Sequence, residues 1–310
     1  MRLQEAIDGY WLENRSQLAT STIPSYQWAL RLFTDYIDAE REISTITSDD
    51  VRRFLSYLKD DKQLSGKSRS NIWVVLSSFW SWAEKEPAVK AKHIIRDVIQ
   101  QPTFIRKKIV PYTQAEVVAM VQACERSAAW TTRNGHTTDS NRDTALRDKA
   151  ILILFLDTGL RASELCSLKI KDFNRANGFI DVLGKGSKER VVVAEANAQK
   201  ALWRYLATRP KAKPDDPLFA TRTNQHLNKD SLRHLVQRIA DRVGVKGATL
   251  HKFRHTYAIT FLRSGGTPLE LQRALGHENL DTVSIYVNLS ASDMQEAQRR
   301  ASPANAWRLK

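Results

Sequence analysis

The sequence contains few cysteines, and this scarcity excludes several classes of protein. Cys124 and Cys166 are the only two in 310 residues, and their spacing matches no metal-binding or redox motif. Each lies in an apolar pattern of helical period, so we expect both to be ordinary core cysteines. The sequence also lacks a phosphate-binding glycine loop and a clustered set of carboxylates for metal ions. We therefore expect neither a cofactor nor a metal site.

Long hydrophobic runs are also lacking. No apolar run reaches the roughly 18 residues that a membrane-spanning helix needs. The first residues, MRLQEAIDGYW, do not contain the apolar segment of a signal peptide. We expect a cytoplasmic protein with no membrane partner.

Acidic residues are scarce relative to basic ones. The chain has 34 Asp and Glu against 48 Lys and Arg, which gives a net charge of +14. Such an excess indicates a polyanionic partner, with DNA or RNA as the first candidate, although a generally basic protein would show the same balance. Binding to DNA would make the protein nucleoid-associated. The length suits two domains, and a hydrophobic content of 42% is sufficient for packed cores.

Residues 1–96 are predicted to form an all-helical domain. In STIPSYQWALRLFTDYI, apolar residues repeat at helical spacing, and TSDDVRRFLSYLKD places Thr47 and Asp50 at capping-box spacing. A third helix is predicted in SGKSRSNIWVVLSSFWSWAEKE. At its start, Lys67 and Arg69 could meet DNA phosphates, or they could lie in a solvated loop.

Residues 97–112 have the character of a linker between two domains. They contain two prolines and the basic run Arg106, Lys107 and Lys108. This run could contact phosphates, but a charged run can equally well be solvated surface. Both interpretations remain open from the sequence alone.

Residues 113–310 are predicted to form a mainly helical domain with a small β-sheet and a C-terminal tail. The strongly apolar helix in TALRDKAILILFLDTGL ends at Gly159, and GFIDVLGKGSKERVVVA is predicted to be a hairpin around a Gly-Lys-Gly turn. The polar stretch 126–144 is expected to be an irregular loop. Further helices are expected near 195–207, 229–243, 251–264, 268–275 and 281–287.

Six residues in this second region are candidates for chemistry. Each has an ordinary structural explanation when it is taken alone: a surface arginine, a turn lysine, residues that flank a helix, or a core tyrosine. The candidates are Arg161 in TGLRASEL, Lys185 in GKGSKER, His251 and Arg254 in HKFRH, His277 in LGH, and Tyr286.

Taken together, these residues resemble the active-site signature of the tyrosine recombinase, or phage integrase, family. Their order is Arg, Lys, His-x-x-Arg, Gly-His and Tyr, and Tyr286 follows His277 by nine residues. The resemblance covers 113–290 strongly, and it covers 1–96 as the expected SAM-like core-binding domain. It is closest to simple, Xer-type members, although the stretch 126–144 is longer than in compact ones.

The resemblance implies a role for each candidate. Arg161 and Arg254 would clamp the non-bridging oxygens of a phosphodiester with forked, permanently charged donors. Tyr286 would attack phosphorus as the nucleophile. The remaining roles are acid/base help from His251, phosphate contact from His277, and proton donation to the 5′-hydroxyl leaving group by Lys185.

The implied function is site-specific DNA recombination through a 3′-phosphotyrosine and a Holliday junction, without metal or ATP. The two domains would form a C-shaped clamp on DNA. Four protomers would act on two sites, with or without a partner recombinase or accessory protein. Two alternatives remain: a nicking and closing enzyme like type IB topoisomerases, and a non-catalytic DNA-binding protein of the same fold.

Overall fold

The computed structural model describes residues 1–89, 91–105, 109–125, 142–184 and 189–276, the backbone of 130–131 and 137–138, and the single residues Val283, Tyr286 and Ser302. The chain divides into two compact units, Met1–Lys108 and Ile109–Lys310. Each unit has its own hydrophobic core. The units are therefore described separately.

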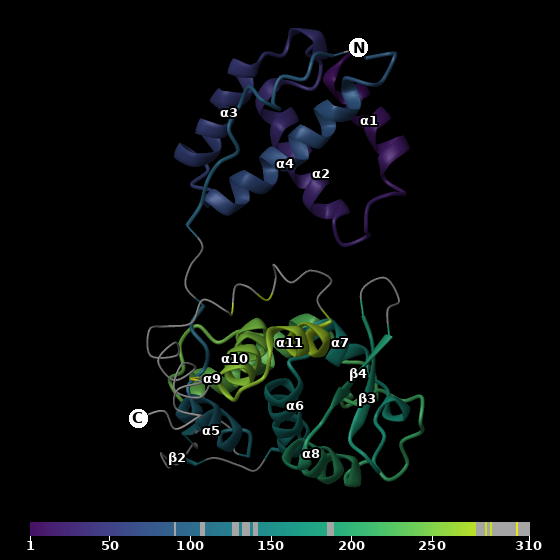
Figure 1. The fold of residues 1–310 in the computed structure, drawn as a ribbon, viewed down its shortest axis with the longest axis vertical. Helices are drawn as coiled ribbons and strands as arrows, with labels where there is room; N and C mark the ends of the chain where they lie inside the picture. Colours follow the sequence, from purple (N-terminus) through teal and green to yellow (C-terminus); the bar gives the residue numbers. More distant parts are fainter. Residues whose placement is uncertain are drawn as a thin grey trace. The chain divides into compact units, whose positions relative to one another are not determined.

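The first unit is helical, as the sequence predicted (Figure 1). Its helices are α1 (Leu3–Asn14), α2 (Ile23–Ile37), α3 (Ser48–Asp60) and α4 (Gly66–Ala83), with a 3-10 turn, η1, at Ile43–Thr45. The predicted capping box at the start of α3 is present, since the Thr47 side chain accepts a hydrogen bond from the Asp50 amide. Helix α1 precedes the three helices that the sequence pattern had singled out.

Aromatic side chains fill the core of the first unit. Phe33 packs edge-to-face against both Phe54 and Trp80, with ring centroids 5.1 and 5.5 Å apart. These three rings come from α2, α3 and α4, so they join three helices at one point. Helix α4 also contacts α1, and it is the central element of this unit.

The second unit combines helices with short antiparallel strands (Figure 1). In chain order its elements are α5 (Gln114–Gln122), β1 (Trp130–Thr131), β2 (Thr137–Thr138), α6 (Ala145–Thr158), α7 (Ala162–Ser167), η2 (Ile170–Asp172), β3 (Phe179–Leu183), β4 (Glu189–Val193), α8 (Ala196–Ala207), α9 (Lys229–Arg242), α10 (Leu250–Arg263) and α11 (Pro268–Leu275). The predicted hairpin is confirmed, because β3 and β4 pair antiparallel from Phe179 with Val193 to Leu183 with Glu189. The fold is therefore mainly α with a small β component, as expected.

Helix α6 is the core helix of the second unit. It carries a run of buried apolar residues and packs against both α8 and α10. It ends at Gly159, whose φ of 60° is the left-handed conformation that glycine adopts without strain. The chain then turns directly into α7, so the end of α6 fixes where Arg161 lies.

Several expectations fall wholly or partly outside the described residues. The turn around Lys185 and most of the expected helix 281–287 lie there, although Val283 and Tyr286 are described. Within the stretch 126–144, β1 and β2 form a two-residue antiparallel pair. Cys124 is buried as expected, whereas Cys166 is only partly buried.

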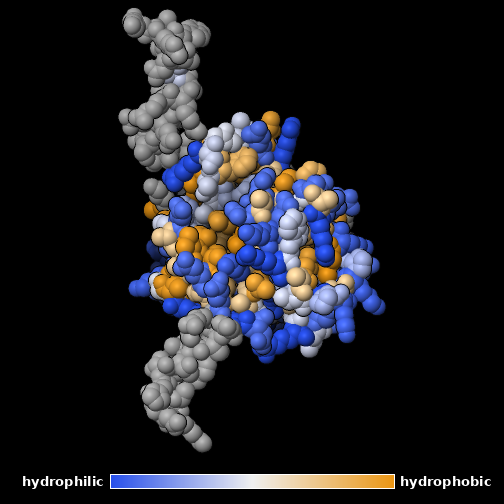
Figure 2. Space-filling view, turned by 90° about the horizontal axis from the view of Figure 1, so that it is seen from below, coloured by the Kyte–Doolittle hydropathy of each residue, from blue (hydrophilic) through white to orange (hydrophobic). Residues whose placement is uncertain are grey.

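The described surface is mixed in character. Figure 2, which looks at the molecule from below the view of Figure 1, shows mostly hydrophilic side chains with hydrophobic ones gathered in smaller patches. In the described part of the chain, every helix is too short or too polar to cross a bilayer.

Candidate active site

The side chain of Arg254 lies at the centre of the candidate site. It extends from α10, is only 2% exposed, and donates one hydrogen bond to the carbonyl of Gly159 and one to the carbonyl of Leu275, each at 2.8 Å. Both carbonyls lie at helix C-termini, where the helix dipole favours a cation. Burial lowers the pKa of Arg254 to about 10, so the guanidinium remains charged near neutral pH. The structure thus holds a fixed positive charge inside the protein.

A buried carboxylate orients Arg161, which is the N-cap residue of α7. Glu164 accepts hydrogen bonds from the Arg161 guanidinium at 2.8 Å and from both terminal nitrogens of Arg190 at 2.8 and 2.9 Å. Burial alone would raise the pKa of Glu164, but the hydrogen bonds from Arg190 and Arg161 lower this pKa to about 2. Glu164 is therefore an anion that fixes two guanidiniums.

Arg161 also reaches the end of α11. Its second terminal nitrogen donates to the carbonyl of Gly276 at 3.2 Å, and its side chain remains 37% exposed. Gly276 ends α11 in the left-handed conformation, with a φ of 62°. The side chain is therefore oriented but still open to a ligand from solvent.

Tyr286 is buried against a small apolar cluster, and its hydroxyl has a defined partner. The side chain is 6% exposed and packs with Ala258, Leu271, Leu275 and Val283. Its hydroxyl oxygen lies 2.9 Å from Nδ1 of His255. Burial raises the pKa of Tyr286, while the charges of Arg254 and Arg161 act to lower it. The two arginines are therefore close enough to act on the phenol.

Two histidines lie one turn apart on α10 and contact each other. The ring centroids of His251 and His255 are 4.3 Å apart, at an angle of 74°. Burial lowers the pKa of both histidines, that of His255 to about 4, and the charge of Arg254 adds to this effect. Both imidazoles are neutral near pH 7 and can accept a proton.

The structure brings four of the six predicted residues together: Arg161, His251, Arg254 and Tyr286. Lys185 and His277 lie outside the described residues, but Gly276, which directly precedes His277, contacts Arg161. His255 was not among the predicted residues. Its position four residues after His251, on the same helix face, is a signal that could have identified it.

The predicted phosphate-contacting residues of the first unit lie at the start of α4. Lys67 is exposed, with its ammonium 4.9 Å from the centre of the Phe104 ring. Arg69 is partly buried, and its Nε is buried without a hydrogen-bond partner among the described residues. The basic run 106–108 lies outside the described residues. Within the described part of the chain, no cluster of three or more His, Cys, Asp or Glu side chains could hold a metal ion.

Comparison with known proteins identifies the family of this chain. The family model described as "Phage integrase family" matches residues 112–293, and the one described as "Phage integrase, N-terminal SAM-like domain" matches residues 11–89. The chain belongs to the phage integrase family, the tyrosine recombinases. It is a Xer-like member and an enzyme of site-specific DNA recombination. The topoisomerase and non-catalytic alternatives are not favoured.

The relatives cover nearly the whole chain. Tyrosine recombinase XerC of Corynebacterium glutamicum is 31% identical, over 92% of this chain and 87% of that protein. Among solved structures, the Tn1549 transposon integrase in complex with transposon right end DNA has a TM-score of 0.76 at 19% identity, covering 97% of this chain and 100% of that one. The XerH recombinase bound to a palindromic difH substrate has a TM-score of 0.71 at 24% identity, covering 91% and 80%. At these identities, the solved structures establish a shared fold.

Proposed function

We propose that the protein cuts and rejoins DNA at specific sites through a covalent bond between Tyr286 and a 3′ phosphate. The observation that carries this proposal is the pairing of the buried Tyr286 hydroxyl with a neutral histidine, His255, within the electrostatic reach of Arg161 and Arg254. A phenol so placed has both a proton acceptor and a positive field, the two aids that a tyrosine nucleophile needs.

The two arginines have distinct parts in the proposal. Arg161 is partly exposed, so its guanidinium meets the phosphate oxygens directly. Arg254 is buried, so its charge acts on the reacting phosphate from inside the protein. Charge that develops on the non-bridging oxygens in the transition state is stabilised by both guanidiniums, which are already in place before the reaction.

The proton of Tyr286 passes to Nδ1 of His255 as the tyrosine oxygen bonds to phosphorus. When the neutral imidazole carries its proton on Nε2, Nδ1 accepts the hydrogen bond that the Tyr286 hydroxyl donates. His251, in contact with the ring of His255, supports the proton transfer from the exposed end of the pair.

Cleavage of the bond from phosphorus to the 5′ oxygen releases a 5′-hydroxyl. The proton of this hydroxyl comes from Lys185, and His277 contacts the phosphate. A 5′-hydroxyl from another strand then reverses the step and rejoins the DNA.

The assembly and location are also part of the proposal. Residues 1–96 and 113–310 serve as the core-binding and catalytic domains, joined by the linker 97–112. Four protomers act on two DNA sites through a Holliday junction, in the cytoplasm at the nucleoid. The net charge of +14 supports contact with DNA, as do the XerH and Tn1549 recombinases of similar fold, which were solved in complex with DNA. The proposed phosphate contacts are Lys67, Arg69, Arg106, Lys107 and Lys108.

Covalent trapping tests this function. The purified protein is incubated with a pool of nicked duplexes of random sequence and then denatured, and the DNA that remains attached is sequenced. We expect wild type to retain DNA with a common sequence, and Tyr286→Phe to retain none while still shifting the same DNA in a native gel. The matched control is Tyr257→Phe, which removes the hydroxyl of a partly buried tyrosine packed against the same apolar cluster, and it should behave as wild type. An adduct with the Tyr286→Phe variant would disprove the assignment of the nucleophile.

A further inference from the structure

A second arginine-rich site lies in the catalytic unit, away from Tyr286. Five arginines line a pocket of about 640 Å³ between the start of α6, the segment around Thr221, and the C-terminal half of α9. They are Arg142, Arg147, Arg222, Arg238 and Arg242. The proposed recombination chemistry uses none of them.

Two of these arginines are held by a buried carboxylate. Asp148 is fully buried and accepts hydrogen bonds from Arg142 at 2.6 Å and from Arg147 at 2.9 and 3.0 Å. Arg147 also donates to the carbonyl of Ala220 at 2.9 Å. Asp148 thus fixes these two guanidiniums as a rigid wall of the pocket.

Two of the other arginines, Arg222 and Arg238, have little acidic compensation among the described residues. Arg238 donates from Nε to the carbonyl of His234 at 3.3 Å, within its own helix, and no described carboxylate pairs with it. Arg222 lies 3.7 Å from Asp143, and both side chains are more than 80% exposed, so this pair is weak. Arg242 donates to the carbonyl of Ala123 at 3.1 Å.

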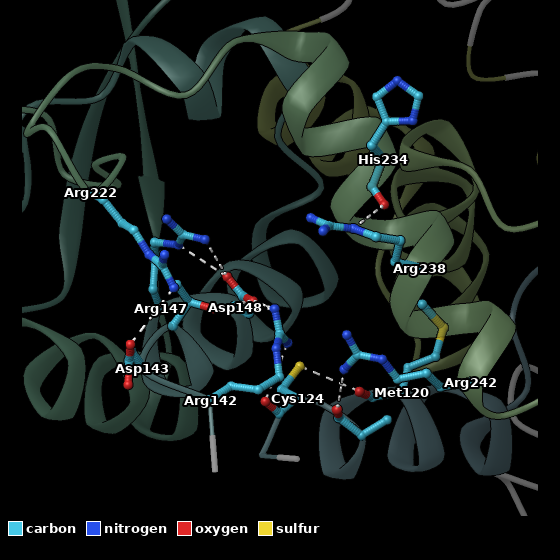
Figure 3. Close-up of polar contacts among 12 residues, drawn as sticks. Met120, Cys124, Arg142, Asp143, Arg147, Asp148, Arg222, His234, Arg238 and Arg242 are labelled. Atoms are coloured by element: carbon cyan, nitrogen blue, oxygen red, sulfur yellow. Dashed lines mark hydrogen bonds and ion pairs between the residues drawn. The ribbon is translucent and has the colours of Figure 1, made fainter. Parts of the chain in front are cut away.

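The geometry concentrates these positive charges. Figure 3 shows the guanidiniums of Arg238 and Arg242 pointing from α9 toward Arg142 and Asp148, with Arg222 and Arg147 on the opposite side. Burial lowers the pKa of Arg242, and the charges of Arg142 and Arg238 lower it further. Like charges gathered in this way are unfavourable unless an anion joins them.

The pocket is distinct from the active site because the two lie at opposite ends of α6. Arg142 and Arg147 flank the start of this helix, and Gly159, which accepts a hydrogen bond from Arg254, lies at its end. A helix of 14 residues separates the ends by about 21 Å. A phosphate that reacts with Tyr286 therefore does not reach the pocket.

We propose that this pocket binds a small anion that carries two or more linked phosphate groups. Forked guanidiniums on facing walls suit phosphate oxygens, which accept paired hydrogen bonds. The volume lies within the range of small-molecule sites. A concave pocket suits a compact anion better than it suits the continuous backbone of a duplex. Inorganic polyphosphate and nucleoside polyphosphates share this chemistry, and the test separates them.

The test measures binding of inorganic tripolyphosphate and of ATP to the full-length protein by calorimetry, at a fixed ionic strength of about 0.15 M. Arg238→Gln and Arg222→Gln each remove one pocket guanidinium without touching the pair formed with Asp148. We expect each to weaken tripolyphosphate binding by about tenfold or more. Arg233→Gln, also on α9 but paired with Asp230 outside the pocket, is the matched control and should leave binding unchanged. Equal affinity for both ligands indicates a site for the phosphate chain alone, and tighter binding of ATP indicates a nucleotide site.

Three outcomes would overturn the proposal. The first is that Arg238→Gln and Arg233→Gln weaken tripolyphosphate binding equally, which would mean that only the net charge of the protein determines binding. The second is loss of binding in Arg161→Ala but not in Arg238→Gln, which would place the anion in the active site. The third is displacement of tripolyphosphate by short duplex DNA in the Arg161→Ala variant, which would make the pocket a DNA contact. Thermal unfolding of each variant without ligand shows whether a loss of binding reflects a loss of fold.

Discussion

The hydroxyl oxygen of Tyr286 lies 2.9 Å from Nδ1 of His255, which directly follows Arg254 in the chain. The family motif had indicated His251 as the acid/base helper, one turn earlier on α10. The rings of the two histidines are in contact, and His255 is the one whose Nδ1 meets the phenol. This relationship makes separate predictions for the two histidines possible.

Replacing His255 should slow the formation of the covalent adduct. His255→Gln removes the group closest to the Tyr286 hydroxyl, and we expect the single-turnover rate to fall roughly 10²-fold or more, with DNA affinity nearly unchanged. The measurement uses the DNA recovered by covalent trapping. His234→Gln, at an exposed position on α9, is the control. If His255→Gln forms the adduct at the wild-type rate and His251→Gln forms it slowly, then His251, not His255, accepts the proton of Tyr286.

The same histidine should make stability depend on pH. Its pKa in the folded protein, about 4, lies below the ordinary 6.5, mainly because burial disfavours the charged form. Between these values the unfolded chain binds a proton that the folded protein does not. Stability is therefore greatest above about pH 6.5 and falls as the pH decreases toward 4.

Urea unfolding at about pH 7 and about pH 5 checks this prediction. Wild type should lose stability on acidification, and His255→Gln should lose less because about one titrating proton is removed. His251 and His93, whose pKa values are also lowered by burial, contribute in the same direction and remain in the variant. An identical loss in wild type and variant would mean that His255 does not titrate in this range.

The sequence was sufficient for most of the elements, though not for α1, β1 and β2, and it was not sufficient for the contacts between them. Local signals predicted the start of α3 through Thr47 and Asp50, the end of α6 at Gly159, and the pairing of β3 with β4. Each of these depends on residues close together in the chain, where capping, left-handed glycine and alternating apolar residues act directly.

The supports of the active site depend instead on tertiary packing. Arg254 meets a carbonyl 95 residues earlier in the chain, at Gly159, and Glu164 meets Arg190, 26 residues later. No periodic pattern encodes such pairs. The candidates Arg161, Arg254 and Tyr286 were recognisable only through their order in a family motif, whereas the partners that hold them required the fold.

Glu164 should be important for both stability and cleavage. Glu164→Gln removes the charge that holds Arg161 and Arg190, and leaving buried charges uncompensated costs roughly 3 kcal/mol. We expect a comparable loss in the free energy of unfolding and a slower adduct rate, because Arg161 loses its orientation. Glu125→Gln breaks an exposed pair with Lys149 and should cost much less, because solvent screens that pair. Similar losses in the two variants would show that the Glu164 cluster contributes no more than a surface ion pair.

Gly159 should tolerate no side chain, for two separable reasons. Its φ of 60° strains any other residue, at a cost of about 1–2 kcal/mol. A Cβ at this position would also overlap the ring of Tyr257 and lie 2.9 Å from Cδ2 of Leu275, so either these side chains or the backbone of Gly159 would have to shift. We expect the backbone to shift, which would displace the carbonyl that accepts a hydrogen bond from Arg254.

Gly244 provides a control that separates the two effects. Its φ is 70°, but a Cβ there would meet no atom within 4 Å. Gly244→Ala should therefore show only the conformational cost, with an unchanged adduct rate. Gly159→Ala should lose more stability in urea unfolding and should also slow adduct formation, because Arg254 would be displaced. If the two variants lose equal stability and both cleave at the wild-type rate, the carbonyl of Gly159 does not position Arg254, and the steric argument for this glycine fails.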